Sequence, residues 1–149
     1  MRLSIIPKTQ LSEAQLRQAT LRIFAPEHQC DIGPRYHWNQ PEFDKHHLVL
    51  FDSESEEFVG TFYCVLHPPV AQDFTWWLDS RMRKKGYWRA LADNVAVYLN
   101  ERNGIEKMGV IVFGQGHLAA SRKIAQRLKE NIEKTASNRG LPALALGRF

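Results

Sequence analysis

The chain has 149 residues, of which 44% are hydrophobic, 11% aromatic and 24% charged, an ordinary globular composition that excludes a disordered or low-complexity protein. A chain of this length buries roughly 70% of its unfolded surface in one core, so we expect a single domain over residues 1–149. The 20 lysines and arginines exceed the 16 aspartates and glutamates, and the net charge of +4 permits a phosphate-bearing partner without requiring one.

The sequence carries no sign of a membrane segment or of a metal site. No uninterrupted apolar run approaches the roughly 20 residues that a membrane span needs, and the start of the chain lacks the cleavage site of a secretory signal. Cys30 and Cys64 form no CxxC pair, and the histidines have no metal-ligand spacing. We therefore expect a reduced, cytoplasmic protein with no membrane contact and no metal.

The first third of the chain predicts a strand, a helix and an irregular segment. The strand is expected at residues 2–6, and Ser12 with Gln15 has the pattern of a capping box at the start of a helix that reaches Pro26. Residues 26–45 contain three prolines, so we expect irregular structure there, with room for one short helix.

Three meandering strands are expected next. Residues 47–51 and 58–66 are apolar or β-branched and flank a polar stretch, which is typical of a hairpin. Residues 74–78 predict a third strand beyond a Pro-Pro break. Because hairpin-linked strands pair antiparallel, these three should be neighbours in one sheet.

The remaining elements alternate between helix and strand. A helix should begin at Tyr87 or Trp88 and end at Gly104. We expect the indole of Trp88 to lie on the apolar stripe of this helix that faces the core. A buried strand at 108–113 should run parallel to 74–78, and a long helix and a short strand at 141–146 should follow. This order of elements predicts an α/β or α+β fold with a mixed sheet.

The most informative segment joins the third meander strand to the next helix. Five of the nine residues 81–89 are basic, and they precede a helix start, where free N–H groups and the positive end of the helix dipole favour an anion. The arrangement is that of a pyrophosphate site, although a solvated basic turn has the same composition.

This segment resembles motif A of the GNAT superfamily of acyl-CoA-dependent N-acyltransferases, R/Q-x-x-G-x-G/A, at residues 83–88. The resemblance covers residues 46–130, and Leu118–Leu128 looks like the family's motif B helix. It implies a GNAT-like, mostly antiparallel sheet flanked by helices, with splayed fourth and fifth strands. It also implies that acetyl-CoA binds through the backbone amides of residues 83–88 and the strand position Leu78. The full cofactor set is Leu78, Arg81, Arg83, Lys84, Lys85, Gly86, Tyr87 and Trp88.

The chain departs from the family pattern at several positions. Trp88 stands where motif A has glycine or alanine, and Leu118 and Ala125 replace the motif B asparagine and the tyrosine that often serves as acid. Direct attack by the amine needs a base and an acid. Asp73 at the start of the fourth strand, Ser121 in motif B and His117 before the last helix are the candidates.

Two functions remain open on this sequence, beside the alternative of a small basic nucleic-acid-binding protein that would use residues 81–89 and the last helix. The first is an N-acetyltransferase that moves an acetyl group from acetyl-CoA to a primary amine on a small molecule or a protein. The second is a catalytically inactive GNAT-like protein that binds another protein or a nucleic acid. The basic last helix leaves open an acidic macromolecular partner, and short terminal strands leave open a homodimer.

Overall fold

The computed structural model describes residues 2–108 and 118–138 and divides into two compact units. The first unit comprises Met1–Tyr63 and Thr75–Tyr87, and the second comprises Cys64–Phe74 and Trp88–Phe149. The sheet has the strand order β1-β2-β3-β4-β5, which confirms the expected meander. The bounds are β1 (Leu3–Pro7), β2 (His47–Asp52), β3 (Phe58–His67), β4 (Val70–Leu78) and β5 (Lys107–Met108).

In the first unit, β2 pairs antiparallel with β3, as expected, and on its other side it pairs antiparallel with β1, a pairing that the sequence did not specify. Gly60 on β3 allows the end of β4 to come close, because a Cβ at this glycine would lie 2.1 Å from the carbonyl oxygen of Trp77. The backbone N–H of Asp79 then donates to the carbonyl of Val59 at 2.9 Å. A close backbone approach therefore fixes the point at which β4 ends.

The helices of the first unit begin where the sequence places their caps. Ser12 caps α1 (Glu13–Ile23), and both hydrogen bonds of the capping box with Gln15 form. The proline-rich segment is more helical than expected, because prolines open its elements rather than end them. Pro26 starts η2 (Pro26–His28), Pro41 starts η3 (Pro41–His46), and α2 (Ile32–Trp38) lies between them.

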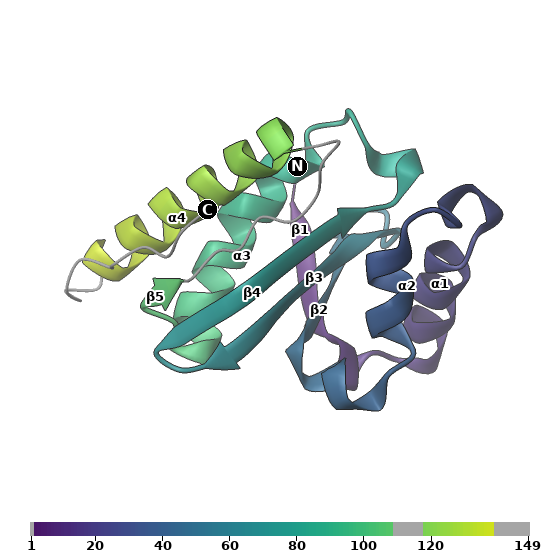
Figure 1. Ribbon diagram of the computed structural model, residues 1–149, viewed down its shortest axis with the longest axis horizontal. Helices are drawn as coiled ribbons and strands as arrows, with labels where there is room; N and C mark the ends of the chain where they lie inside the picture. Colours follow the sequence, from purple (N-terminus) through teal and green to yellow (C-terminus); the bar gives the residue numbers. More distant parts are fainter. Residues whose placement is uncertain (1, 109–117, 139–149) are drawn as a thin grey trace. The chain divides into compact units, whose positions relative to one another are not determined.

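One hydrophobic core joins these helices to the sheet of the first unit. Ile23 of α1, Trp38 of α2 and Phe58 of β3 belong to it, with Ala19, Val49, Phe51 and Trp77. Figure 1 shows α1 and α2 lying side by side. Because both helices are anchored in this core, their ends are fixed relative to the strand ends of the same unit.

The second unit holds the parallel strand pair and the two long helices. Val70 and Ala71 of β4 pair parallel with Lys107 and Met108 of β5, which confirms the expected crossover direction. Between them runs α3 (Tyr87–Asn103), which ends at Gly104 with φ +64, the left-handed conformation that glycine adopts without penalty.

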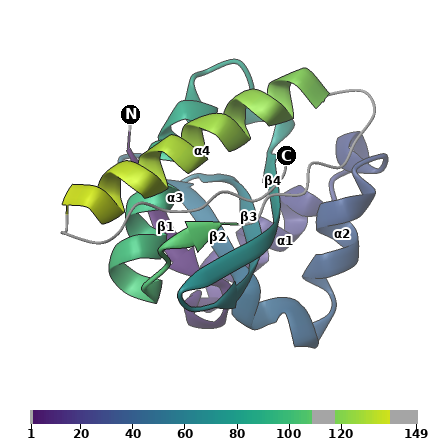
Figure 2. The ribbon, with the colours of Figure 1, turned by 60° about the vertical axis from the view of Figure 1, so that its left-hand side comes forward.

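The last helix, α4 (Leu118–Asn138), lies alongside α3 (Figure 2). Its described buried residues Ala125, Leu128 and Ile132 fall on the predicted apolar face. Asp93 of α3 accepts hydrogen bonds from Arg127 Nε at 2.9 Å and from Asn131 Nδ2 at 2.6 Å. The two helices are therefore joined by polar contacts at the edge of an apolar interface.

The fold class matches the expectation of a mixed, mostly antiparallel sheet flanked by helices. β4 begins four residues earlier than predicted, directly after the Pro-Pro break. Residues 109–113 and 141–146, expected as strand, lie outside the described residues, as does the place where β4 and β5 would splay. Within 2–108 and 118–138, no helix has the length and apolar character that crossing a membrane requires.

Candidate functional site

The segment between β4 and α3, residues 79–86, is called the basic turn below. It begins with the short helix η4 (Ser80–Met82) and reaches α3 through two left-handed residues, Lys84 at φ +62 and Gly86 at φ +88. A Cβ at Gly86 would have nothing within 4 Å, so the backbone conformation, rather than space, requires glycine there. The turn therefore has a defined backbone path into the helix.

A buried carboxylate holds the entrance of the basic turn. Asp79 is fully buried and accepts two hydrogen bonds from Arg22, at 2.7 Å from Nε and at 2.9 Å from Nη2. It also accepts the backbone N–H of Arg81 at 3.1 Å. Burial alone would raise the pKa of Asp79, but the hydrogen bonds from Arg22 and Arg81 outweigh it and lower that pKa. This carboxylate therefore stays charged and fixes α1 to the strand end.

A buried histidine adds a second tie at the same place. His28 Nδ1 lies 2.6 Å from the carbonyl of Arg22, so this nitrogen donates. Its Nε2 accepts the backbone N–H of Ser80 at 3.1 Å and lies 2.9 Å from the Ser80 hydroxyl. The Ser80 hydroxyl in turn donates to Glu27 at 3.3 Å. The first residue of η4 is therefore positioned by two side chains of η2, one of which is itself held by a backbone carbonyl of α1.

The exit of the basic turn is held by a phenol. Tyr87, the first residue of α3, donates its hydroxyl proton to Asp52 at the end of β2 over 2.8 Å. Burial and this hydrogen bond raise the pKa of Tyr87 to about 12. Asp52 also accepts the backbone N–H groups of Glu54 and Ser55. Both ends of the turn are thus fastened to the sheet and helices of the first unit.

The four cations of the basic turn fall into two groups. Arg83 donates from Nε to the carbonyl of Leu78 at 3.0 Å and from Nη2 to Asp31 at 3.2 Å. Arg81 reaches Asp79 at 3.5 Å. Lys84 and Lys85 are exposed and bond to no group in the part of the chain that the structure describes. The arginines are therefore held by acids, and the lysines face the solvent.

The backbone amides of the basic turn also fall into two groups, those that donate within the turn and those that do not. The amide of Arg81 is used by Asp79, and the amides of Met82 and Arg83 donate to the carbonyls of Asp79 and Ser80. Among the described residues, the amides of Lys84, Lys85, Gly86 and Tyr87 donate to no other group and are left to meet an anion. Together with the two exposed lysines they form a small cationic surface that could receive a pyrophosphate.

The other candidate residues lie in the second unit. Asp73 is half-buried in β4 and has φ +58, an irregularity inside the strand. Trp88 is half-buried rather than fully in the core, and the guanidinium of Arg89 lies 5.3 Å from its ring centroid. Ser121 falls within α4, and His117 lies outside the described residues.

Sequence reasoning missed the residues that hold the turn, Arg22, His28, Asp31 and Asp79. Asp79 could have been found from the sequence, because an acid directly before a run of cations is expected to form an ion pair within the chain. Arg22 and Asp31 lie in α1 and in the segment before α2, 57 and 52 positions from their partners. No local pattern in the sequence marks them.

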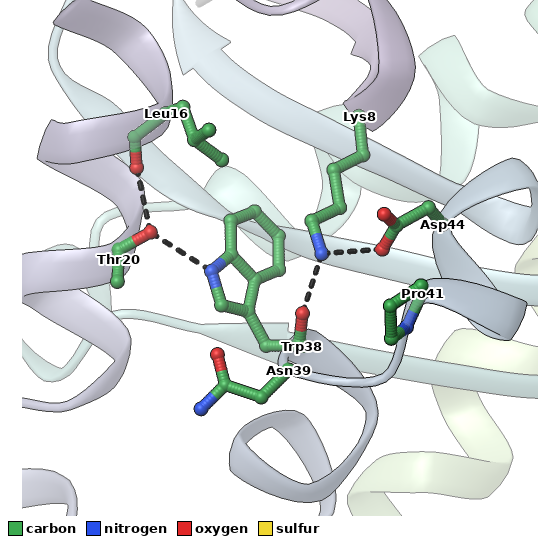
Figure 3. Close-up of a pocket in the computed structure, with 7 residues that line it drawn as sticks. All are labelled: Lys8, Leu16, Thr20, Trp38, Asn39, Pro41 and Asp44. Carbon is green, nitrogen blue, oxygen red and sulfur yellow. Dashed lines mark hydrogen bonds and ion pairs between the residues drawn. The ribbon is translucent and has the colours of Figure 1, made fainter. Parts of the chain in front are cut away.

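A cavity of about 290 Å³ lies elsewhere in the first unit, between the middle of α1 and the end of α2 (Figure 3). The ammonium of Lys8 lies between Trp38 and Asp44 and donates to the carbonyl of Trp38 and, over 2.6 Å, to Asp44. The same ammonium lies 4.2 Å from the centroid of the Trp38 ring. The cavity is lined by Lys8, Leu16, Thr20, Trp38, Asn39, Pro41 and Asp44.

The cation of this cavity is already coordinated by the chain, and the indole N–H of Trp38 is likewise used by Thr20 at 2.9 Å. Beside it, burial and the positive charge of Lys8 lower the pKa of His47 to about 4. No group of three metal-ligating side chains occurs among the residues that the structure describes, here or at the basic turn.

The family model described as "Acetyltransferase (GNAT) family" matches residues 13–122. No curated protein matches the chain. A solved GNAT-family acetyltransferase from Bacillus anthracis aligns with a TM-score of 0.58 and 12% identity over 86% of this chain and 79% of its own.

Two further solved structures align similarly. The N-acetyltransferase PseH from Campylobacter jejuni, in complex with acetyl coenzyme A, has a TM-score of 0.54 and 15% identity over 84% of this chain and 85% of its own. The spermidine/spermine N-acetyltransferase SpeG from Vibrio cholerae, in complex with manganese ions, has a TM-score of 0.54 and 12% identity over 85% and 76%. At these identities the likeness concerns the fold.

Proposed function

Because the chain belongs to the acetyltransferase (GNAT) family, we propose that it is an N-acetyltransferase that moves an acetyl group from acetyl-CoA to a primary amine. The observation that carries this proposal is the basic turn. Its exposed Lys84 and Lys85 stand directly before the start of α3, and Gly86 gives the backbone the left-handed step into the helix. The amides from Lys84 onward, with the positive end of the helix dipole, would bind the pyrophosphate.

The acetyl-CoA would lie with its pyrophosphate on the basic turn and its pantetheine arm along the end of β4 near Leu78. The residues present fit this ligand, because the turn offers exposed cations and unused amides where the negative charge would lie. When bound, acetyl-CoA supplies an acyl group that is activated as a thioester. The chain's part is to bind it, to orient the acceptor and to move protons.

The transfer would proceed by direct attack. The amine nitrogen bonds to the acetyl carbon, the carbon–sulfur bond breaks, the nitrogen loses a proton and the thiolate gains one. We propose Asp73 as the base, acting through water, and Ser121 or His117 as the acid that protonates the thiolate. The irregular backbone at Asp73 supports a catalytic role for this position. Residues with a strained backbone are found most often at functional sites.

The acceptor is proposed at the level of chemical class, a primary amine on a small molecule or a protein. PseH and SpeG are both named as N-acetyltransferases, and SpeG is named for spermidine and spermine. These names support an amine acceptor for this chain. A screen of amines, with thiol release as the signal, would identify which amine the protein acetylates.

The decisive experiment is a calorimetric titration of the protein with acetyl-CoA, followed by an assay of CoA thiol release with a panel of primary amines. Saturable binding and amine-dependent thiol release are the expected results. If acetyl-CoA at millimolar concentration does not bind, the proposed enzyme function is wrong.

A second function is favoured by one observation, the indole of Trp88 at the motif position where the family has a small residue. If this indole covers the start of α3, the protein does not bind acetyl-CoA and acts by binding another macromolecule. The variant Trp88→Ala separates the two. An unchanged melting temperature with newly gained CoA binding would identify the natural chain as a non-catalytic member of the family. A lower melting temperature without gained CoA binding would support the enzyme function.

A further inference from the structure

The side chain of Arg83 is folded back from the basic turn onto the end of β4. Its Nε donates to the carbonyl of Leu78 at 3.0 Å, and its Nη2 donates to the Oδ2 of Asp31 at 3.2 Å. That same Asp31 oxygen accepts the indole N–H of Trp77 at 2.9 Å. The acid therefore has a partner of its own in the sheet, and it does not depend on Arg83 for its position.

We propose that Asp31 regulates the affinity of this protein for acetyl-CoA by holding Arg83 in this folded-back position. The inference rests on the proposed function, because it concerns the same cofactor. In the folded-back position Arg83 occupies the Leu78 carbonyl, which the pantetheine arm would need, and its charge is compensated by Asp31 instead of a phosphate. Asp31 and the cofactor therefore compete for one guanidinium.

The electrostatics of the turn give the direction of the effect. Asp31 places a negative charge beside the surface that would receive a pyrophosphate, and Trp77 keeps it there after Arg83 has left. Asp79, the other acid that contacts an arginine of the turn, is fully buried and compensated by Arg22. Of these two acids, Asp31 is the one whose removal would raise the positive potential of the turn without leaving a buried cation unpaired.

The size of the effect follows from exposure. The side chains of Arg83 and Asp31 are 46% and 31% exposed, so their ion pair is a surface pair of modest strength. Removing the competition should tighten acetyl-CoA binding about two- to fivefold at low salt. High salt should diminish the difference, because both charges reach the solvent.

The test is the dissociation constant of acetyl-CoA for the unmodified protein and for Asp31→Asn, measured by calorimetry. Asparagine keeps an oxygen that accepts the Trp77 N–H, and it removes the charge. The matched control is Glu13→Gln, which neutralises another surface acid of the first unit, 3.7 Å from Arg17. We expect Asp31→Asn to bind more tightly and Glu13→Gln to bind like the unmodified protein.

A double variant tests whether Asp31 acts through Arg83. In an Arg83→Met background, Asp31→Asn should keep only the smaller part of its effect on the dissociation constant that comes from the charge of Asp31 itself, since the competition for the guanidinium no longer exists. If the unmodified protein binds acetyl-CoA and Asp31→Asn binds it equally or more weakly, the regulatory inference is wrong and the proposed function stands. If neither protein binds acetyl-CoA at millimolar concentration, both are wrong.

Discussion

Lys8 in the cavity and the cations of the basic turn both lie in the first unit, but their surroundings differ. The side chain of Lys8 is 9% exposed, and its ammonium is shared by a carboxylate, a carbonyl and an indole face. Lys84 and Lys85 are exposed at the start of a helix and bond to no described group. The two arginines of the turn are intermediate, since each is held by one acid.

This contrast separates two uses of positive charge. A cation that the chain itself coordinates contributes to stability and has little charge to offer a ligand, however inviting the cavity around it. A cation whose field reaches the solvent contributes little to stability and is available to an anion. Mutations at the two places should therefore affect different measurements, and the following predictions test that division.

The largest effect is expected at the buried carboxylate that fastens the turn. Asp79→Ala leaves the guanidinium of Arg22, which is 17% exposed, without its main partner, and should lower the free energy of unfolding by about 3–5 kcal/mol. Chemical denaturation at neutral pH measures it. The matched control is Asp93→Ala, which breaks the half-exposed Arg127 pair and the hydrogen bond from Asn131 and should cost about 1–2 kcal/mol. Equal losses in the two variants would contradict the role assigned to burial.

The next effect is the pH dependence of stability near the cavity. The pKa of His47 is about 4 in the folded protein and about 6.5 in an unfolded chain. Above pH 6.5 the imidazole is neutral in both states. As the pH falls toward 4, only the unfolded state takes the proton, so stability should fall by about 3 kcal/mol over this range.

Denaturation curves recorded between pH 7 and pH 4 measure this loss. The variant His47→Gln cannot titrate there and should show a correspondingly flatter dependence. The lowered pKa of Asp79 adds a further loss, which appears only at lower pH, as that carboxylate is protonated. A slope that persists unchanged in His47→Gln would show that another group is responsible.

A smaller loss of stability is expected at Lys8. Lys8→Met removes the charged hydrogen bonds to Asp44 and to the Trp38 carbonyl, and should lower the free energy of unfolding by about 2 kcal/mol. Acetyl-CoA affinity should not change, and calorimetry on the folded variant checks this. Lys45→Met, at an exposed lysine of η3, serves as the control and should be nearly neutral.

The reverse pattern is expected at the exposed lysines of the turn. Lys84→Glu combined with Lys85→Glu should leave the melting temperature almost unchanged and weaken acetyl-CoA binding about tenfold to a hundredfold, less at high salt. Reversing Arg17 and Lys45 together, two exposed cations elsewhere in the same unit, is the control. Equal weakening by both pairs would mean that net charge, rather than the turn, governs binding.

The sequence predicted those parts of the molecule that depend on neighbours along the chain. Ser12 and Gln15 specify the capping box, and Gly104 specifies the end of α3. The apolar run before the basic turn predicts the strand that leads into that turn. The start of β4 was missed, because Gln72 and Asp73 interrupt its apolar pattern.

The candidate site was predicted as a turn but not as a network. Which of its cations are available depends on Asp31 and Arg22, and these meet the turn only after α1 and α2 have packed on the sheet. From composition alone the four cations of the turn are equivalent. In the folded chain two of them are held by acids and two are exposed to solvent. Spacing along the chain carries no information on such distant pairs.

The oxygen of Asp31 that serves both Arg83 and Trp77 also makes the turn observable. The indole N–H proton of Trp77 resonates apart from the backbone amides in an NMR spectrum, and its chemical shift reports the strength of the hydrogen bond it donates. When Arg83 leaves, the indole no longer shares that oxygen with a guanidinium, and its hydrogen bond should strengthen. A ligand arriving at the turn would therefore move one well-resolved signal, without a label or a probe being attached to the protein.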